Sequence, residues 1–158
     1  MFKLIRLMVV VSASLFAVSP VQGEDNKAIV RQYYAEVLTK GNVAAIDSFV
    51  SPTYIGHDPA APDAQGTVGL KQRVTRMRTA FPDLQVKVED MVAEGDKVAT
   101  RFTLQGTHKG EFGGVAPTGK HVTWTATSII RLEDGKFAEG WANADDLGRM
   151  RQLGALPQ

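Results

Sequence analysis

The sequence contains no cysteine. This absence excludes disulfide bonds, zinc sites built on thiolates and a cysteine nucleophile. It also excludes a lipid-modified cysteine behind the apolar N-terminal run. A domain made from this chain therefore depends on its hydrophobic core. With 158 residues, of which 44% are hydrophobic, the chain suits one globular domain rather than two.

An excess of charge of either sign is also lacking. The chain has 18 basic and 17 acidic side chains, so its formal net charge is +1. No stretch concentrates lysine and arginine in the way that a nucleic-acid-binding surface requires. We therefore expect no nucleic-acid partner.

Long apolar runs are absent except near the N-terminus. Lys3 and Arg6 precede a 12-residue apolar run that ends at Val18, and small residues follow as far as Gly23. This pattern is typical of a secretory signal peptide, and the run is short for a membrane span.

We therefore interpret residues 1–23 as a signal peptide, cleaved near Gly23. Residues 24–158 would then form the folded domain, periplasmic or secreted, with no membrane attachment after cleavage. Because the removed segment carries two basic side chains and no acidic ones, the mature domain would have a net charge of −1. The alternative is an uncleaved N-terminal anchor.

The spacing of hydrophobic residues changes along the chain from helical to alternating. Apolar residues one turn apart predict helices at 26–40, 42–50 and 67–81. Alternating residues predict strands at 84–94, 98–108, 121–132 and 138–144, and a bulge near Glu89. A short helix at 147–153 follows. Helices followed by a run of antiparallel strands indicate an α+β fold.

The last predicted strand carries two very different faces. One side has only small residues: Ala138, Gly140, Ala142 and Ala144. The other side has Glu139, Trp141, Asn143 and Asp145. We expect the second side to face a cavity, where a carboxylate beside an indole loses water and becomes a proton carrier. The alternative is that Asp145 or Asp146 caps the following helix.

Several motifs resemble those of SnoaL-like polyketide cyclases, also called ester cyclases. They are Tyr33-Tyr34, residues 54–59, 80–84, 89–96 and 106–110, Pro117-Thr118-Gly119, and residues 141–154. The resemblance spans residues 27–154. It implies the NTF2-like cone, in which three N-terminal helices pack on a curved antiparallel sheet of about four strands, with a short C-terminal helix.

The same resemblance implies a chemistry. Characterised members close a ring by intramolecular aldol condensation and need neither cofactor nor metal. Their acid–base aspartate falls on Asp145 and a histidine falls on His57, so these two are the predicted catalytic residues. One departure is Ala144, where many relatives carry an aromatic residue.

Six further residues are predicted to contact substrate: Trp141, Trp124, Tyr33, Asn143, Arg101 and His108. Trp141, Trp124 and Tyr33 can line the cavity, although large aromatic side chains belong more often to a core. The Asn143 amide can donate to a carbonyl oxygen.

Arg101 and the remaining histidines allow two interpretations each. Arg101 either pairs with a carboxylate inside the cone or faces water, and His108 either contacts substrate or lies in a rim or turn. His121 is expected to be exposed. The spacing of the three histidines matches no metal-binding motif, so no metal site is predicted.

These observations predict a cofactor-free enzyme that acts on a small apolar carbonyl compound. One alternative is a secreted module that binds a hydrophobic molecule without reaction. Another is an epoxide hydrolase or dehydratase that uses Asp145, Asp146 or Glu139. The alternating threonines at 123, 125 and 127 give one strand a polar face suited to pairing, so a homodimer is expected.

Overall fold

The computed structural model describes residues 20–157. The predicted signal peptide falls mostly on residues 1–19, which lie outside this part of the chain, and Pro20–Gly23 belong to the first helix. No helix within the described residues is both long and apolar enough to cross a membrane.

The helices lie before the sheet, in the crossover within it, and after it. They are α1 (Pro20–Tyr33), the π-helix η1 (Tyr34–Thr39), the 3-10 helix η2 (Val43–Ala45), α2 (Ile46–Phe49), α3 (Gly66–Ala80) and α4 (Asp146–Leu153). Because η1 continues α1 directly, the two together form the predicted first helix. The wider π turn lets two consecutive residues, Tyr33 and Tyr34, both be buried.

Five strands form one sheet in the order β1-β5-β4-β3-β2. They are β1 (Val50–His57), β2 (Gln85–Glu94), β3 (Lys97–Thr107), β4 (His121–Glu133) and β5 (Lys136–Ala144). Strand β1 runs parallel to β5, and every other pairing is antiparallel. The four predicted strands are confirmed, as is the bulge in β2, which falls between Val88 and Asp90.

Strand β1 was not expected as a strand. Its sequence carries Pro52 near the start and alternates weakly, and its partner β5 lies far along the chain. Proline is tolerated here because β1 is an edge strand, where one side of the backbone needs no partner.

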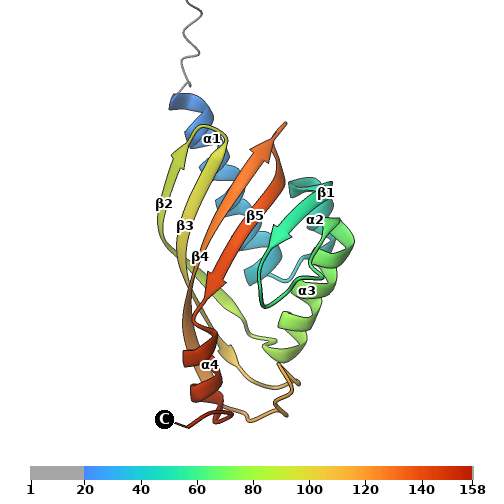
Figure 1. Ribbon diagram of the computed structural model, residues 1–158, viewed down its shortest axis with the longest axis vertical. Helices are drawn as coiled ribbons and strands as arrows, with labels where there is room; N and C mark the ends of the chain where they lie inside the picture. Colours follow the sequence, from blue (N-terminus) through green and yellow to red (C-terminus); the bar gives the residue numbers. More distant parts are fainter. Residues whose placement is uncertain (1–19, 158) are drawn as a thin grey trace, which may run out of the picture.

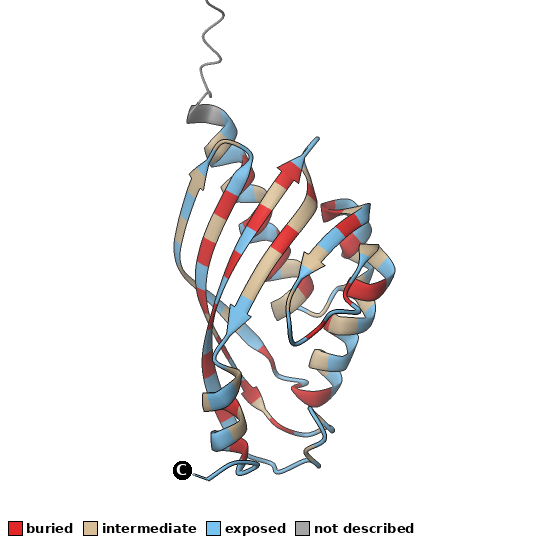
Figure 2. Cartoon of the chain, in the orientation of Figure 1, coloured by how far each residue is buried: buried red, intermediate tan, exposed pale blue. Residues whose placement is uncertain are grey.

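The sheet is strongly curved, with α1 behind it and α3 beside β1 (Figure 1). Buried and exposed residues alternate along β3 and β4 (Figure 2), so one face of the sheet packs inward and the other is solvated. We call these the inner and the outer face. This arrangement confirms the predicted α+β fold, with helices packed on a curved, mainly antiparallel sheet.

Candidate active site

A cavity of roughly 210 Å³ lies between the inner face and the helices α1, η1, α3 and α4. Most of its wall is apolar, and aromatic side chains dominate it: Tyr33, Tyr34, Tyr54, Phe102, Phe112, Trp124 and Phe137. The volume lies below the range typical of sites for drug-sized ligands. The cavity therefore suits a small ring system, or one end of a longer molecule.

The β4–β5 register decides which face of β5 the cavity meets. Ala142 lies opposite Ser128 and Ala144 opposite Ala126, and both partners are buried on the inner face. Directly opposed residues share a face. The small side of β5 therefore faces inward. The sequence grouped the two sides correctly. Of the side expected to face the cavity, Trp141 and Asn143 border it, whereas Glu139 and Asp145 do not.

Gly140 explains why the small side is required. A Cβ atom at this position would lie 2.2 Å from the Tyr54 hydroxyl and 2.9 Å from Ile130 Cδ1. Because Tyr54 closes over β5 at this point, a side chain here would collide with the cavity wall. The absence of a side chain at Gly140 is therefore a packing requirement.

The opposite side of β5 builds a polar cluster on the outer face. His57 Nε2 lies 2.9 Å from a Glu139 carboxylate oxygen, and the other oxygen accepts from Arg131. The His57 ring stacks on Trp141 with centroids 5.1 Å apart. Hydrogen bonding from His57, with Arg131 adding to it, lowers the pKa of Glu139. Trp141 and Asn143 border the cavity as well, but His57 does not line it.

The two aspartates after β5 have different roles. Asp145 is exposed and caps α4, because its carboxylate accepts from the Gly148 backbone N–H at 2.8 Å. The capping interpretation is thus confirmed, and Asp145 is not part of the cavity wall. Asp146 does line the cavity and accepts from Arg149. The catalytic role implied for Asp145 stays a prediction.

Arg149 places a buried guanidinium at the cavity wall. Its side chain is only 6% exposed, and it lies 4.3 Å from the Phe112 ring centroid and 5.1 Å from that of Trp124. Burial lowers its pKa. Its Nε atom has no hydrogen-bond partner among the described residues. A buried donor without a partner indicates room for an acceptor supplied by a ligand.

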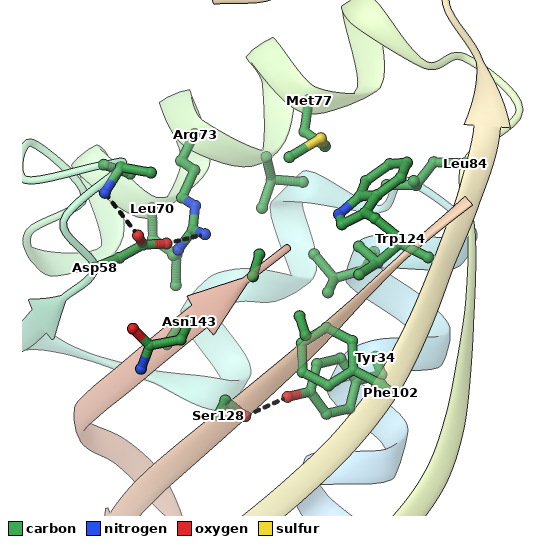
Figure 3. Close-up of a pocket in the computed structure, with 18 of the residues that line it drawn as sticks. Tyr34, Asp58, Leu70, Arg73, Met77, Leu84, Phe102, Trp124, Ser128 and Asn143 are labelled. Carbon is green, nitrogen blue, oxygen red and sulfur yellow. Dashed lines mark hydrogen bonds and ion pairs between the residues drawn. The ribbon is translucent and has the colours of Figure 1, made fainter. Parts of the chain in front are cut away.

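A second ion pair lines the cavity close to Arg149, and we call this end of the cavity its mouth. Asp58, in the loop after β1, accepts from Arg73 of α3 and from the Ala60 backbone N–H (Figure 3). Its carboxylate is 13% exposed. Both charges of this pair act on the pKa of Arg149, Arg73 lowering it and Asp58 raising it. Local patterns in the sequence do not indicate this pair, because only the fold brings Asp58 and Arg73 together.

The inner face carries one polar contact among its apolar side chains. The hydroxyls of Tyr34 and Ser128 lie 2.7 Å apart, away from the Asp58–Arg73 pair (Figure 3). Burial raises the pKa of Tyr34 to about 12. Among the described strand residues, no carboxylate or imidazole lies on the inner face, and the carboxylates that line the cavity are those of Asp58 and Asp146.

The remaining predicted site residues are distributed as follows. Tyr33 and Trp124 line the cavity, as expected. Arg101 lies on the outer face, is paired with Asp90, and does not touch the cavity, because its position in β3 has the outward phase. Asn143, on the outward side of β5, is exposed at the cavity rim.

His108 was expected either to contact substrate or to lie in a rim or turn, and it lies in the loop that directly follows β3. It is fully buried, and its Nδ1 accepts from the Thr118 backbone N–H at 3.2 Å. It is not among the cavity-lining residues, because the loop at 109–120 folds over it. His121 is exposed, as expected. Across residues 20–157, no three histidine, aspartate or glutamate side chains gather in a way that would hold a metal ion.

Comparison with known proteins agrees with this architecture. The sequence profile of the SnoaL-like polyketide cyclase family matches residues 28–153. Aklanonic acid methyl ester cyclase DnrD of Streptomyces peucetius is 29% identical over 108 residues, which cover 67% of this chain and 72% of DnrD. Nogalonic acid methyl ester cyclase of Streptomyces nogalater is 27% identical over 119 residues, which cover 72% of this chain and 87% of that enzyme.

Solved structures show the same fold. A SnoaL-like protein from Jannaschia sp. CCS1 has a TM-score of 0.79 and 26% identity, over 88% of this chain and 97% of its own. AclR of Streptomyces galilaeus, whose proposed activity is that of a hydroxylase, has a TM-score of 0.76 and 32% identity. The match covers 85% of this chain and 84% of AclR. The fold is thus the NTF2-like cone, and the chain belongs to the SnoaL-like polyketide cyclase family.

Proposed function

We propose that the protein catalyses cofactor-free enolate chemistry, such as an aldol-type cyclisation, on a small apolar carbonyl compound. The observation that carries the proposal is the Asp146–Arg149 pair, which sets a carboxylate beside a buried guanidinium at the wall of an aromatic cavity. The family supports the reaction class, since the relatives DnrD and the Streptomyces nogalater enzyme are both named ester cyclases.

The chemistry needs one base and one group that stabilises negative charge. The Asp146 carboxylate removes a proton from the carbon next to the substrate carbonyl, and the Arg149 guanidinium stabilises the enolate oxygen. The enolate carbon then attacks a second carbonyl of the same molecule and forms a carbon–carbon bond. The resulting alkoxide takes the proton back from the Asp146 carboxyl, so the product is an isomer of the substrate.

The experiment measures enolisation directly. 2,6-Diacetylnaphthalene, which carries an acetyl group at each end, is incubated with the protein in D2O, and loss of its methyl proton signal is followed by NMR. We expect Asp146→Asn to slow this exchange about 100-fold or more, because the proton acceptor is gone. The matched control is Asp145→Asn, which keeps a capping side chain and should exchange at the wild-type rate. The opposite result, with only Asp145→Asn inactive, would assign the base to Asp145.

A second candidate function is binding of a hydrophobic molecule without reaction. The inner face favours it, because among the described strand residues it offers no carboxylate or imidazole to a deeply bound ligand. Binding of 2,6-diacetylnaphthalene by the wild-type protein with no proton exchange above the buffer rate would support this function and would contradict the enzymatic one.

Export and pairing are part of the proposal. A signal peptide ending near Gly23 is supported by its sequence pattern. A homodimer is supported by the exposed threonines at 123, 125 and 127 on the outer face. N-terminal sequencing of the protein from its native cell tests the first, and light scattering at two protein concentrations tests the second.

A further inference from the structure

Three hydroxyl groups meet on the inner face, and the chemistry proposed above does not use them. Tyr34 comes from η1, Ser128 from β4 and Thr100 from β3. Thr100 and Ser128 are directly opposed in the antiparallel register, so their side chains share the inner face. Both the Ser128 and the Thr100 hydroxyl act on the pKa of Tyr34. All three side chains are buried.

This cluster has more hydrogen-bonding capacity than the protein uses. Each hydroxyl has one donor and two acceptor positions. The described residues provide one side-chain contact within it, 2.7 Å between Tyr34 and Ser128. The Thr100 hydroxyl is buried and has no hydrogen-bond partner among those residues. Thr100 does not itself line the cavity, but Tyr34 and Ser128 beside it do. Because buried polar groups are nearly always paired, the unpaired hydroxyl indicates that this cluster has hydrogen-bonding capacity left for a partner from outside the protein.

The surroundings define what this partner is. Tyr34 and Ser128 line the cavity together with apolar side chains such as Phe102 and Ala126. No charged side chain lies on the inner face among the described strand residues, so a charged ligand group would be buried without a counter-ion. A neutral oxygen, by contrast, can accept from the hydroxyls while the adjoining rings contact its carbon skeleton.

We infer that the Tyr34, Ser128 and Thr100 hydroxyls form a binding site for one neutral oxygen atom, a carbonyl or hydroxyl at the inner end of the ligand. This inference deepens the proposed function, because it rests on the same cavity being occupied. The ligand class is therefore a compact apolar ring system with polar groups at two ends. One end meets the hydroxyl cluster, and the other meets the Asp146–Arg149 pair.

The experiment compares two probes that differ in a single atom group. 2-Acetylnaphthalene carries a carbonyl, and 2-isopropenylnaphthalene replaces its oxygen with a methylene of similar shape. Calorimetric titration gives the two dissociation constants. We expect wild-type protein to bind the ketone about three- to tenfold more tightly, which is the usual net effect of one hydrogen bond. In Tyr34→Phe and in Ser128→Ala this preference should fall to about one.

The matched control is Thr103→Val. Thr103 also lies on β3, but its hydroxyl donates to Glu89 on the outer face and is not part of the cluster. This variant should keep the wild-type preference, and circular dichroism melts confirm that each variant is folded. Equal binding of the two probes by wild-type protein, or a preference that survives in Tyr34→Phe, would overturn the inference.

Failure of the proposed enzymatic function can be distinguished from failure of this inference. Proton exchange can be absent while the ketone preference is present, which leaves the hydroxyl cluster as the recognition site of a binding protein. Asp146→Asn should remove exchange and leave the preference unchanged. Loss of the ketone preference in Asp146→Asn would place the carbonyl at the mouth and contradict the inference.

Discussion

The two faces of the sheet come from the same strands but are stabilised by different interactions. The inner face encloses the cavity with apolar side chains and three hydroxyls, whereas the outer face is held by ion pairs such as Arg101–Asp90 and the His57–Glu139–Arg131 cluster. Side chains on the inner face contribute through packing, where each change of volume has a large effect. On the outer face, water and salt screen each interaction. Four predictions test this difference, from the largest expected effect to the smallest.

The two tryptophans provide the strongest test. Trp124 is 2% exposed on the inner face and contacts Phe81, whereas Trp141 is partly exposed and stacks on His57. We expect Trp124→Ala to lower the free energy of unfolding by about 3–5 kcal/mol, because it leaves a cavity. Trp141→Ala should cost about 1 kcal/mol. Urea unfolding followed by circular dichroism measures both, and similar losses would contradict the comparison.

Gly140 tests the contact between β1 and β5. Gly140→Ala should lower the free energy of unfolding by about 1–3 kcal/mol, since its Cβ atom would overlap the Tyr54 hydroxyl. In a Tyr54→Phe background the same substitution should cost clearly less, because the overlapping oxygen is absent. A double-mutant cycle by urea denaturation measures the difference, and strict additivity would show that Tyr54 does not set the size limit at this position.

Asp145 tests the helix cap at the end of β5. Asp145→Ala removes the acceptor for the Gly148 N–H and should lower the free energy of unfolding by about 1 kcal/mol. Asp145→Asn, which keeps a capping oxygen, should be nearly neutral. Thermal melts of the two variants give the comparison. An equal loss in both would indicate that the charge of Asp145, rather than the cap, stabilises the protein.

Glu139 gives the smallest effect, and the effect depends on pH. The pKa of Glu139 is lowered in the folded state by the His57 hydrogen bond, and its ordinary value is 4.5. A lowered carboxyl pKa stabilises the fold above the unfolded pKa, and this stabilisation disappears as the pH falls through the folded pKa. Glu139→Gln should therefore melt earlier than wild type at pH 7, and the gap should close below about pH 4. A gap of constant size across this range would contradict the assignment.

Periodicity predicted most of the secondary structure, because each element buries one regular face. The two sides of β5 were grouped correctly for the same reason. Which side faces the cavity could not be predicted, because it depends on the β4–β5 register, on the bulge between Arg131 and Leu132, and on Tyr54 closing over Gly140. Alternation alone defines two faces and does not identify the inner one.

The ion pairs at the cavity mouth could not be predicted from local sequence patterns either. Asp58 precedes a proline in a loop, and its partner Arg73 lies on α3, 15 residues further along the chain. Asp146 was named only as an alternative, because the family resemblance assigned the catalytic role to its neighbour Asp145. The structure distinguishes the two residues at the start of α4: Asp145 caps the helix, whereas Asp146 lines the cavity.

The parallel pairing of β1 with β5 has a consequence for how the protein is made. β1 is synthesised early, but its partner, Lys136–Ala144, is synthesised only after β2, β3 and β4. Contacts between such distant segments slow folding, because the intervening chain must be ordered first. A nascent chain therefore cannot close its cavity until β5 has been synthesised, and a premature stop before Lys136 leaves β1 and its aromatic neighbours open to aggregation.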